Sequence, residues 1–303
     1  MRKLFLMTAI AATTVFTMAA CGNKTDKGDN ADSTATAEPG EQKAESKFGP
    51  MGTWDFPQTL GALKDLDNIE YVLFPGYYTK AMEKGEDPAT ATNIYYRAKI
   101  VEAGETTTKV KAVVDVDEIP NSLLIPIYKG ATAKKGDIVL TWWQSGSGMQ
   151  QAIVTDDSNP AEPKISYLTL NYKGDGTGIA EKKQDQLKPN SFIVLSDGKW
   201  EPGQPIVVKK DGDENLGIIL NIDGDKILWQ GFASKVYVSK KSDCRLMPLK
   251  PAVSVGDKVK YEFVGELRDG ATVTKYDASI GRVWVKKENS DKEDIKSIFE
   301  IEK

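Results

Sequence analysis

Short runs of β-branched and aromatic residues recur from Ile69 to the end of this 303-residue chain, and Gly, Pro, Asp or Asn bounds each run. Tyr71–Phe74, Ile138–Leu140 and Ile206–Val208 are examples. Runs of this kind are typical of β-strands. Asp223-Gly224 lies between two of them, where it fits a two-residue hairpin turn. We therefore expect an all-β fold.

The runs also recur as sets. Gly136-Asp137 precedes one set of strands, and Gly256-Asp257 precedes a matching set near the end of the chain. A diverged set follows Pro202-Gly203, and a more irregular one runs from Tyr71 to Ile127. Repeats of roughly 50–70 residues, each with four or five short strands, indicate an array of small barrels.

These sets resemble SH3-like or Tudor-like barrel repeats, most closely over Ala131–Leu195 and Lys250–Lys303. The resemblance implies tandem small SH3-like barrels and no particular function, because such folds serve many functions. The expected β modules span 53–130, 131–198, 199–249 and 250–303. The first module is irregular and includes a short helix over Gln58–Leu66, where leucines recur at every third position.

The N-terminus has the pattern of an export signal. Arg2 and Lys3 precede an apolar stretch from Leu4 to Ala20, which ends in small residues before Cys21. A basic start, an apolar middle and small residues before a cleavage site are the parts of a secretory signal. The stretch is shorter than the roughly 20 residues that cross a bilayer comfortably. We expect residues 1–20 to be a signal peptide.

Met18-Ala19-Ala20-Cys21 resembles the lipobox of bacterial lipoproteins, although Met18 stands where Leu is commoner. The resemblance implies cleavage after Ala20, acylation of Cys21 and a membrane partner, since two or more acyl chains anchor a protein stably. Gly22 favours the outer membrane of the bacterial cell envelope under the enteric-type sorting pattern. An uncleaved signal anchor with an incidental cysteine is the alternative.

Residues 21–52 form the expected lipidated cysteine and flexible tether. Small and polar residues dominate from Asn23 to Ser46, so this segment has too little apolar surface to form a core. We expect the tether to be disordered and to hold the β modules away from the lipid surface.

Composition excludes several functions. The 44 acidic residues outnumber the 40 basic ones, which argues against nucleic acid as a partner. The chain has no histidine, which removes Ser-His-Asp and Cys-His hydrolases and most zinc sites. With Cys21 acylated, Cys244 has no partner for an intramolecular disulfide, and it is either a buried structural thiol or a reactive one. We expect no catalytic residues, no metal site and no cofactor.

Trp142-Trp143 is the most conspicuous candidate for ligand binding. Adjacent side chains of a strand point to opposite faces, so one ring should enter the core and the other should be exposed. An exposed ring beside the flexible residues 145–148 could stack on a sugar or grip a peptide. The alternative is that the outer ring packs against a neighbouring module.

Asp211–Gly217 superficially suggests a calcium loop. Leu216 and Ile222 stand where such a loop needs Gly and a bidentate Glu, so we expect a polar hairpin turn instead.

Three functions follow from these observations. We expect a lipid-anchored binding or adhesion module whose ligand is a protein, a matrix component or a glycan. The alternatives are a structural or scaffolding subunit of an envelope complex and a histidine-free hydrolase. The hydrolase would need a concave site with two carboxylates, and nothing in the sequence singles out such a pair.

Overall fold

The computed structural model describes residues 61–88, 91–144, 148–170, 184–288 and 290–303. All of them belong to one compact unit, Glu45–Lys303. The expected signal peptide, the lipidated Cys21 and the tether lie outside the described residues. Among the helices of the described ranges, none is both long and apolar enough to cross a membrane.

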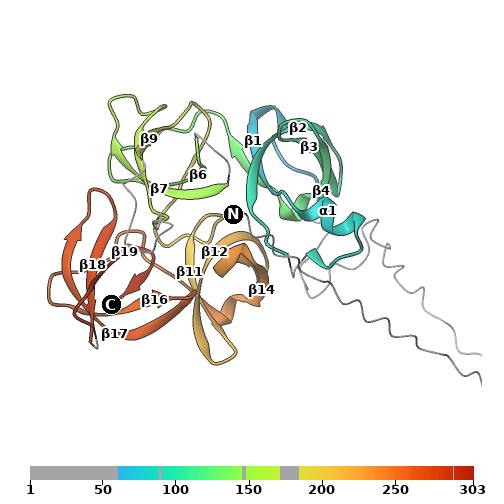
Figure 1. The fold of residues 1–303 in the computed structure, drawn as a ribbon. Helices are drawn as coiled ribbons and strands as arrows, with labels where there is room; N and C mark the ends of the chain where they lie inside the picture. Colours follow the sequence, from blue (N-terminus) through green and yellow to red (C-terminus); the bar gives the residue numbers. More distant parts are fainter. Residues whose placement is uncertain (1–60, 89–90, 145–147, 171–183, 289) are drawn as a thin grey trace, which may run out of the picture. The chain divides into compact units, whose positions relative to one another are not determined.

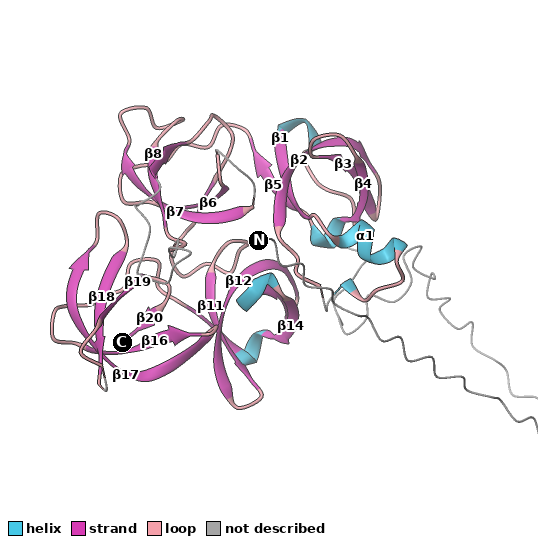
Figure 2. Cartoon of the chain, viewed as in Figure 1, coloured by secondary structure: helices cyan, strands magenta, loops and turns pink. Residues whose placement is uncertain are grey.

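Antiparallel strands dominate the chain, which confirms the all-β prediction (Figures 1 and 2). The first five strands pair in the order β4-β3-β2-β1-β5 and form what we call the first group. Their bounds are β1 Ile69–Pro75, β2 Tyr95–Ala103, β3 Thr107–Lys111, β4 Val116–Pro120 and β5 Ile125–Tyr128.

The second group has the same strand order, written in the opposite direction: β10-β6-β7-β8-β9. Here β10 takes the place of β5, and β9 takes the place of β4. Its first and last strands therefore pair, Leu140 opposite Ile193, while the first four follow one another. The bounds are β6 Ile138–Trp142, β7 Met149–Asp156, β8 Lys164–Tyr167, β9 Gln184–Gln186 and β10 Ile193–Val194.

The third and fourth groups have the same internal order and are joined into one ten-stranded sheet by β12 and β17, where Asn215 lies opposite Glu266. The third group comprises β11 Pro205–Lys210, β12 Asp213–Asp223, β13 Lys226–Gln230, β14 Val236–Lys240 and β15 Cys244–Leu246. The fourth comprises β16 Lys258–Phe263, β17 Glu266–Asp277, β18 Arg282–Lys287, β19 Glu293–Ser297 and β20 Ile301–Glu302.

None of these sheets closes into a barrel within the described part of the chain. The fourth and fifth strands of each group lie at opposite ends of its strand order and are not paired with each other. The all-β architecture is confirmed, and the resemblance of the groups to small SH3-like barrels stays a prediction. The short strands β10, β15 and β20 each pair with the first strand of their group. Each of them forms one end of the strand order of its group.

A single turn geometry opens the second group. Gly136 has φ +87, and its N–H donates to the carbonyl of Val154 at 2.8 Å. Val154 N–H in turn donates to the carbonyl of Asp137, whose carboxylate accepts from Lys134 N–H at 2.8 Å. Glycine suits this turn because positive φ is costly for residues with a Cβ.

The fourth group opens with the same bonds. Gly256 has φ +93 and donates to Val273, Val273 donates to the carbonyl of Asp257, and the Asp257 carboxylate accepts from Ser254 N–H. In the third group Gly203 has φ +94 and donates to Ile219. The Gly-Asp signal thus corresponds to a defined backbone turn.

Helix is scarce. The helix expected over Gln58–Leu66 is not found in its described part: the chain has no helix over 61–65, and a 3-10 helix, η1, follows at Leu66–Asn68. Asp65 has φ +54, which is incompatible with a continuous α-helix. The sequence analysis missed α1, Tyr78–Glu83, which lies in the long connection between β1 and β2. Further 3-10 helices are η3 Asn121–Leu123, η4 Phe232–Ser234 and η5 Lys241–Asp243.

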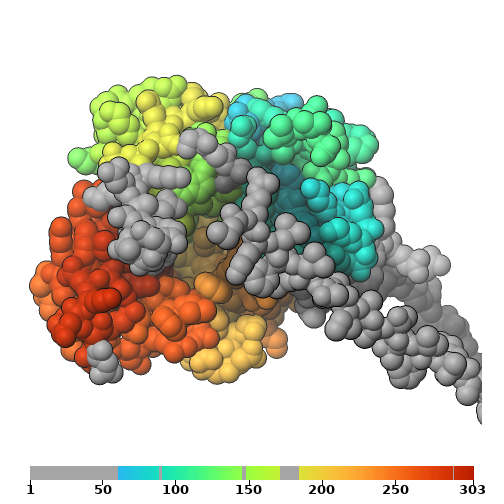
Figure 3. Space-filling view, viewed as in Figure 1, coloured from blue at the N-terminus to red at the C-terminus, as the bar shows by residue number. Residues whose placement is uncertain are grey.

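The four groups share one apolar core. A single cluster of buried side chains includes Val72, Leu140, Leu220 and Ile301, one from each group. Figure 3 shows one outer face of the molecule, coloured along the chain. Side chains also bond across groups to main-chain carbonyls. Gln151 donates to Gly203, Asn221 to Ser122, Gln230 to Asn93, and Arg282 to Tyr167. Each of these bonds joins two different groups, so the groups are held in a fixed arrangement.

Candidate functional site

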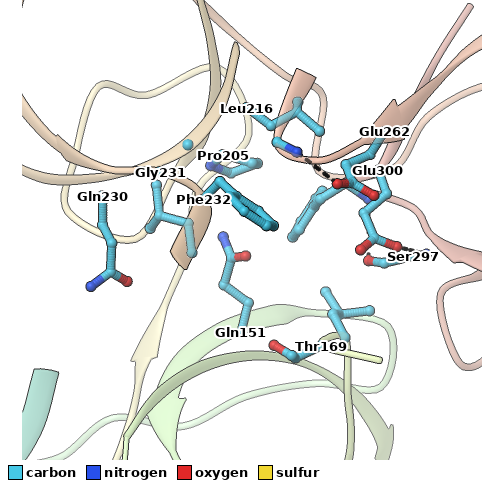
Figure 4. A pocket seen from close by; sticks show the side chains of 15 residues that line it. Gln151, Thr169, Pro205, Leu216, Gln230, Gly231, Phe232, Glu262, Ser297 and Glu300 are labelled. Carbon is cyan, nitrogen blue, oxygen red and sulfur yellow. Dashed lines mark hydrogen bonds between the residues drawn. The ribbon is translucent and has the colours of Figure 1, made fainter. Parts of the chain in front are cut away.

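A pocket of about 220 Å³ lies where the second, third and fourth groups meet (Figure 4). Its polar lining comes from all three: Gln151 and Thr169, Gln230, and Glu262, Ser297 and Glu300. Two phenylalanines, Phe232 and Phe299, also line it. Concave sites with apolar walls and a few placed polar groups are the usual form of ligand sites.

Glu262 and Glu300 bring two carboxyl groups to one side of this pocket. Glu262 is the next-to-last residue of β16, and its carboxylate accepts from Lys296 Nζ and from Gly265 N–H, both at 2.8 Å. Glu300 precedes β20, and its carboxyl accepts from Ser297 N–H at 2.7 Å. Glu262 N–H donates to the Glu300 carbonyl at 2.7 Å, which fixes the two residues side by side.

The surroundings of Glu300 raise its pKa to about 7, mainly because burial disfavours the ionised carboxylate. The neighbouring charge of Glu262 raises the pKa further, whereas the bond from Ser297 and the charges of Lys296 and Arg282 lower it. Glu300 therefore exchanges its proton near neutral pH and can either donate or accept a hydrogen bond there.

Phe232 forms the exposed edge of the pocket. It is 57% exposed, and Figure 4 shows its ring extending into the space between the third group and the carboxyl groups of the fourth. It lies in η4, where Ala233 and Ser234 have φ +55 and +56. Positive φ at two successive residues with side chains is strained, and such strain is typically found at binding sites and switch regions.

A second strained turn lies beside Phe232. Val264 has φ +55, a rare conformation for a β-branched residue, and Gly265 follows with φ +83. A Cβ on Gly265 would stand 2.5 Å from the Cβ of Phe232, so the glycine permits the close approach of the two turns. Gly265 also accepts a bond from Leu216 N–H at 2.8 Å, which ties its turn to β12.

The lining limits the chemistry of a ligand. Two glutamates and two glutamines line the pocket, and none of the described lining residues is Lys or Arg. Carboxylates and amide oxygens accept hydrogen bonds, and amide nitrogens donate them. An anion would meet acidic groups without a cation from the lining, so the pocket favours neutral polyhydroxylated or cationic ligands.

The tryptophan pair lies elsewhere. Trp142 is 2% exposed, and its ring meets Tyr71 of the first group edge-on at 5.1 Å. Trp143 is half-buried against the core of the second group, 4.2 Å from the Tyr167 ring. The two rings point to opposite sides, but the expected exposed ring is not found. Ligand binding by Trp142 and Trp143 stays a prediction without an exposed ring to support it.

The remaining sequence candidates have separate positions. Cys244 is half-buried at the start of β15, and burial raises the pKa of its thiol to about 11, which makes it a poor nucleophile. Asp211-Gly212 forms the hairpin turn between β11 and β12, as predicted. Within the described ranges no three Asp, Glu or Cys side chains are grouped as metal ligands.

Sequence reasoning missed the pocket because its lining comes from three separate sets of strands. Two signals were nevertheless present. Glu300 interrupts the apolar run Ile298–Ile301, and Phe232 stands in the turn segment 231–234 rather than in a strand run. An acid inside an apolar run and an aromatic residue in a turn both depart from the pattern of a simple repeat.

Neither a scan of the chain against protein-family models nor a search of curated proteins finds a match.

Proposed function

We propose that the protein is a lipid-anchored lipoprotein of the bacterial cell envelope and that it binds a glycan in the pocket beside Phe232. One observation carries the ligand class: an exposed aromatic ring stands beside carboxyl and amide groups. A sugar offers apolar C–H groups on its ring face and hydroxyl groups at its rim. Phe232 can stack on the face while the carboxyl groups of Glu262 and Glu300 bond the hydroxyls.

The anchoring part of the proposal depends on the sequence of residues 1–21. The lipobox resemblance supports acylation of Cys21, and the following polar segment supports a tether that presents the β groups at the membrane surface. Gly22 supports the outer membrane.

Binding of neutral and amino-sugar oligosaccharides to the full lipoprotein, measured by calorimetry or on a glycan array, tests the ligand. Phe232→Ala should weaken binding at least tenfold, because it removes the stacking surface. Phe263→Ala is the matched control, since Phe263 is a 45% exposed phenylalanine of β16 that does not line the pocket. Equal losses in both variants, or binding that survives Phe232→Ala, would contradict the proposed site.

A histidine-free hydrolase is the second candidate, because Glu262 and Glu300 form a carboxyl pair in a concave site. Glycosidases use two carboxyl groups, one of which has a raised pKa and serves as general acid. Glu300 would take that role and Glu262, which is paired with Lys296, the other. Release of new reducing ends from a bound oligosaccharide, abolished by Glu300→Gln, would favour catalysis. Binding without release would leave the protein a lectin-like module.

A scaffolding role can be distinguished by experiment from glycan binding and from glycan hydrolysis. It predicts an envelope protein that co-purifies with the full lipoprotein after crosslinking in living cells. Retention of that partner by Phe232→Ala, together with no glycan binding by the wild type, would favour scaffolding. Trp142→Ala is unsuitable for this test, because loss of a buried ring damages the core.

A further inference from the structure

We propose that Asn93, a residue of the first group that does not line the pocket, positions Phe232 for ligand binding. This inference rests on the proposed pocket function. It makes the site dependent on all four groups, because the lining comes from the second, third and fourth.

Asn93 holds both ends of the turn that carries Phe232. Its backbone N–H donates to the carbonyl of Ser234 at 2.9 Å, and its carbonyl accepts from Gln230 Nε2 at 2.6 Å. Gln230 and Ser234 flank Phe232 on either side. The turn is closed internally by Gly231 N–H, which donates to the carbonyl of Lys235 at 2.8 Å.

The side chain of Asn93 in turn fixes its own backbone. Asn93 is fully buried, and its amide donates to the carbonyls of Pro88 at 2.7 Å and Ala91 at 3.2 Å. Its other side-chain atom, Oδ1, is buried without a hydrogen-bond partner. An unsatisfied buried carbonyl oxygen costs free energy. The two bonds that the amide nitrogen donates therefore hold the side chain in this position.

The strained turn explains why such a support is needed. Ala233 and Ser234 both have positive φ, and residues in this conformation persist where the surrounding structure fixes them. Phe232 is 57% exposed, so packing alone does not hold its ring. Asn93 bonds the Ser234 backbone on one side of Phe232 and the Gln230 side chain on the other, so the turn and the direction of its ring are held from both sides.

The sharpest test is a double-mutant cycle on glycan binding. Asn93→Ala should weaken binding three- to tenfold and should have no further effect in a Phe232→Ala background, because Asn93 acts through the ring. Asn221→Ala is the matched control. It removes the side-chain bond of another asparagine, which joins the third group to the Ser122 carbonyl of the first group, whereas Asn93→Ala removes only bonds within the first group. Asn221 does not line the pocket.

A readout without ligand separates this inference from the proposed function. Hydrogen exchange of the amides in Gly231–Lys235 should accelerate at least tenfold in Asn93→Ala, while exchange in β12 stays unchanged. Additive losses in the cycle, or unchanged exchange in the turn, would overturn the role of Asn93. If exchange accelerates in Asn93→Ala but the wild-type protein binds no oligosaccharide, Asn93 supports the turn as proposed and only the glycan function is refuted.

Discussion

The second and fourth groups share their turn chemistry and differ at the pocket. Both open with the same Gly-Asp turn, and the residue four positions after each glycine, Leu140 or Lys260, lies opposite Ile193 or Glu302 of the last strand, which makes Ile193 and Glu302 equivalent. Ser191 and Glu300 are then also equivalent. Each bonds to the residue three positions earlier: Ser191 Oγ donates to the Lys188 carbonyl, and Glu300 accepts from Ser297 N–H.

The difference shows how one backbone frame serves two purposes. In the second group the position holds a fully buried serine that only closes the local turn. In the fourth group the longer carboxyl side chain makes the equivalent closure and also reaches the pocket beside Glu262. The repeated hydrogen bonds hold the backbone of both groups in the same conformation. The side chain at this position then decides whether a functional group reaches the pocket.

The largest effect should come from Arg282, which has an exposed counterpart in the second group. Arg282 is 5% exposed and donates to carbonyls on both sides of the contact between the second and fourth groups, including Tyr167 and Leu168. Arg282→Ala would leave these buried carbonyls unsatisfied, so we expect a loss of about 3–5 kcal/mol in the free energy of unfolding. Urea unfolding measures it, and Arg282→Lys should recover part of the loss. A loss below about 1 kcal/mol would show that the contact does not depend on Arg282.

Glu300 should give the fourth group a pH dependence that the second lacks. Its pKa is about 7 in the folded protein against an ordinary value of 4.5, so the folded state binds the proton more tightly than the unfolded state. The resulting stability is complete below about pH 4.5 and is lost as pH rises through 7, which amounts to about 3 kcal/mol. The difference in unfolding free energy between wild type and Glu300→Gln, measured from pH 4 to pH 8, should show this slope. A difference independent of pH would contradict it.

The two opening turns should respond equally to the same substitution. Gly136→Ala and Gly256→Ala each force a residue with a Cβ to positive φ, at a cost of about 1–2 kcal/mol. A Cβ at Gly256 meets no atom within 4 Å, and one at Gly136 meets only Lys250 Nζ at 3.7 Å, so steric contact adds little. Thermal or urea unfolding of both variants checks the equality. Markedly unequal losses would mean that the groups do not share one frame.

The smallest effect should come from Lys164, the counterpart of Arg282 in the second group. Lys164 pairs with Asp156 across the strands β7 and β8, and Arg282 pairs with Asp277 across β17 and β18. The ammonium of Lys164 pairs with Asp156 at 3.2 Å, but its side chain is 62% exposed. Exposed ion pairs contribute little to stability. Lys164→Ala should leave the unfolding midpoint unchanged in the same assay that detects Arg282→Ala. A large shift would show that the second group also depends on this position.

The repeated turns could be predicted because each requires a particular residue type. Positive φ selects glycine at 136 and 256, and the carboxylate of Asp137 or Asp257 accepts a backbone N–H three residues earlier. The all-β fold was predictable for a similar reason, since β-branched runs bounded by turn residues have few other solutions. The local sequence was therefore sufficient to predict the structure wherever the local backbone geometry requires a particular residue type.

The pocket was not predictable in the same way. Glu262, Gln151 and Phe232 come together through contacts between groups, and no local pattern encodes such contacts. The helix over Gln58–Leu66 failed because a leucine spacing of three also suits a packed loop, where Leu63 contacts the core and Asp65 adopts positive φ. The prominent Trp142 was placed in the core by the first group, which the alternation of one strand cannot reveal.

Several contacts between groups end on main-chain carbonyls, as the bonds from Gln151, Asn221 and Arg282 show, whereas the third and fourth groups also meet through the ion pairs Arg245–Glu302 and Lys260–Glu214. A carbonyl is present whatever residue carries it, so in the bonds to carbonyls only the donor side chain is specified by sequence. The receiving segment can change its residues freely while the arrangement of groups persists. Such a chain can vary the residues of a receiving segment without rebuilding the frame that supports the pocket.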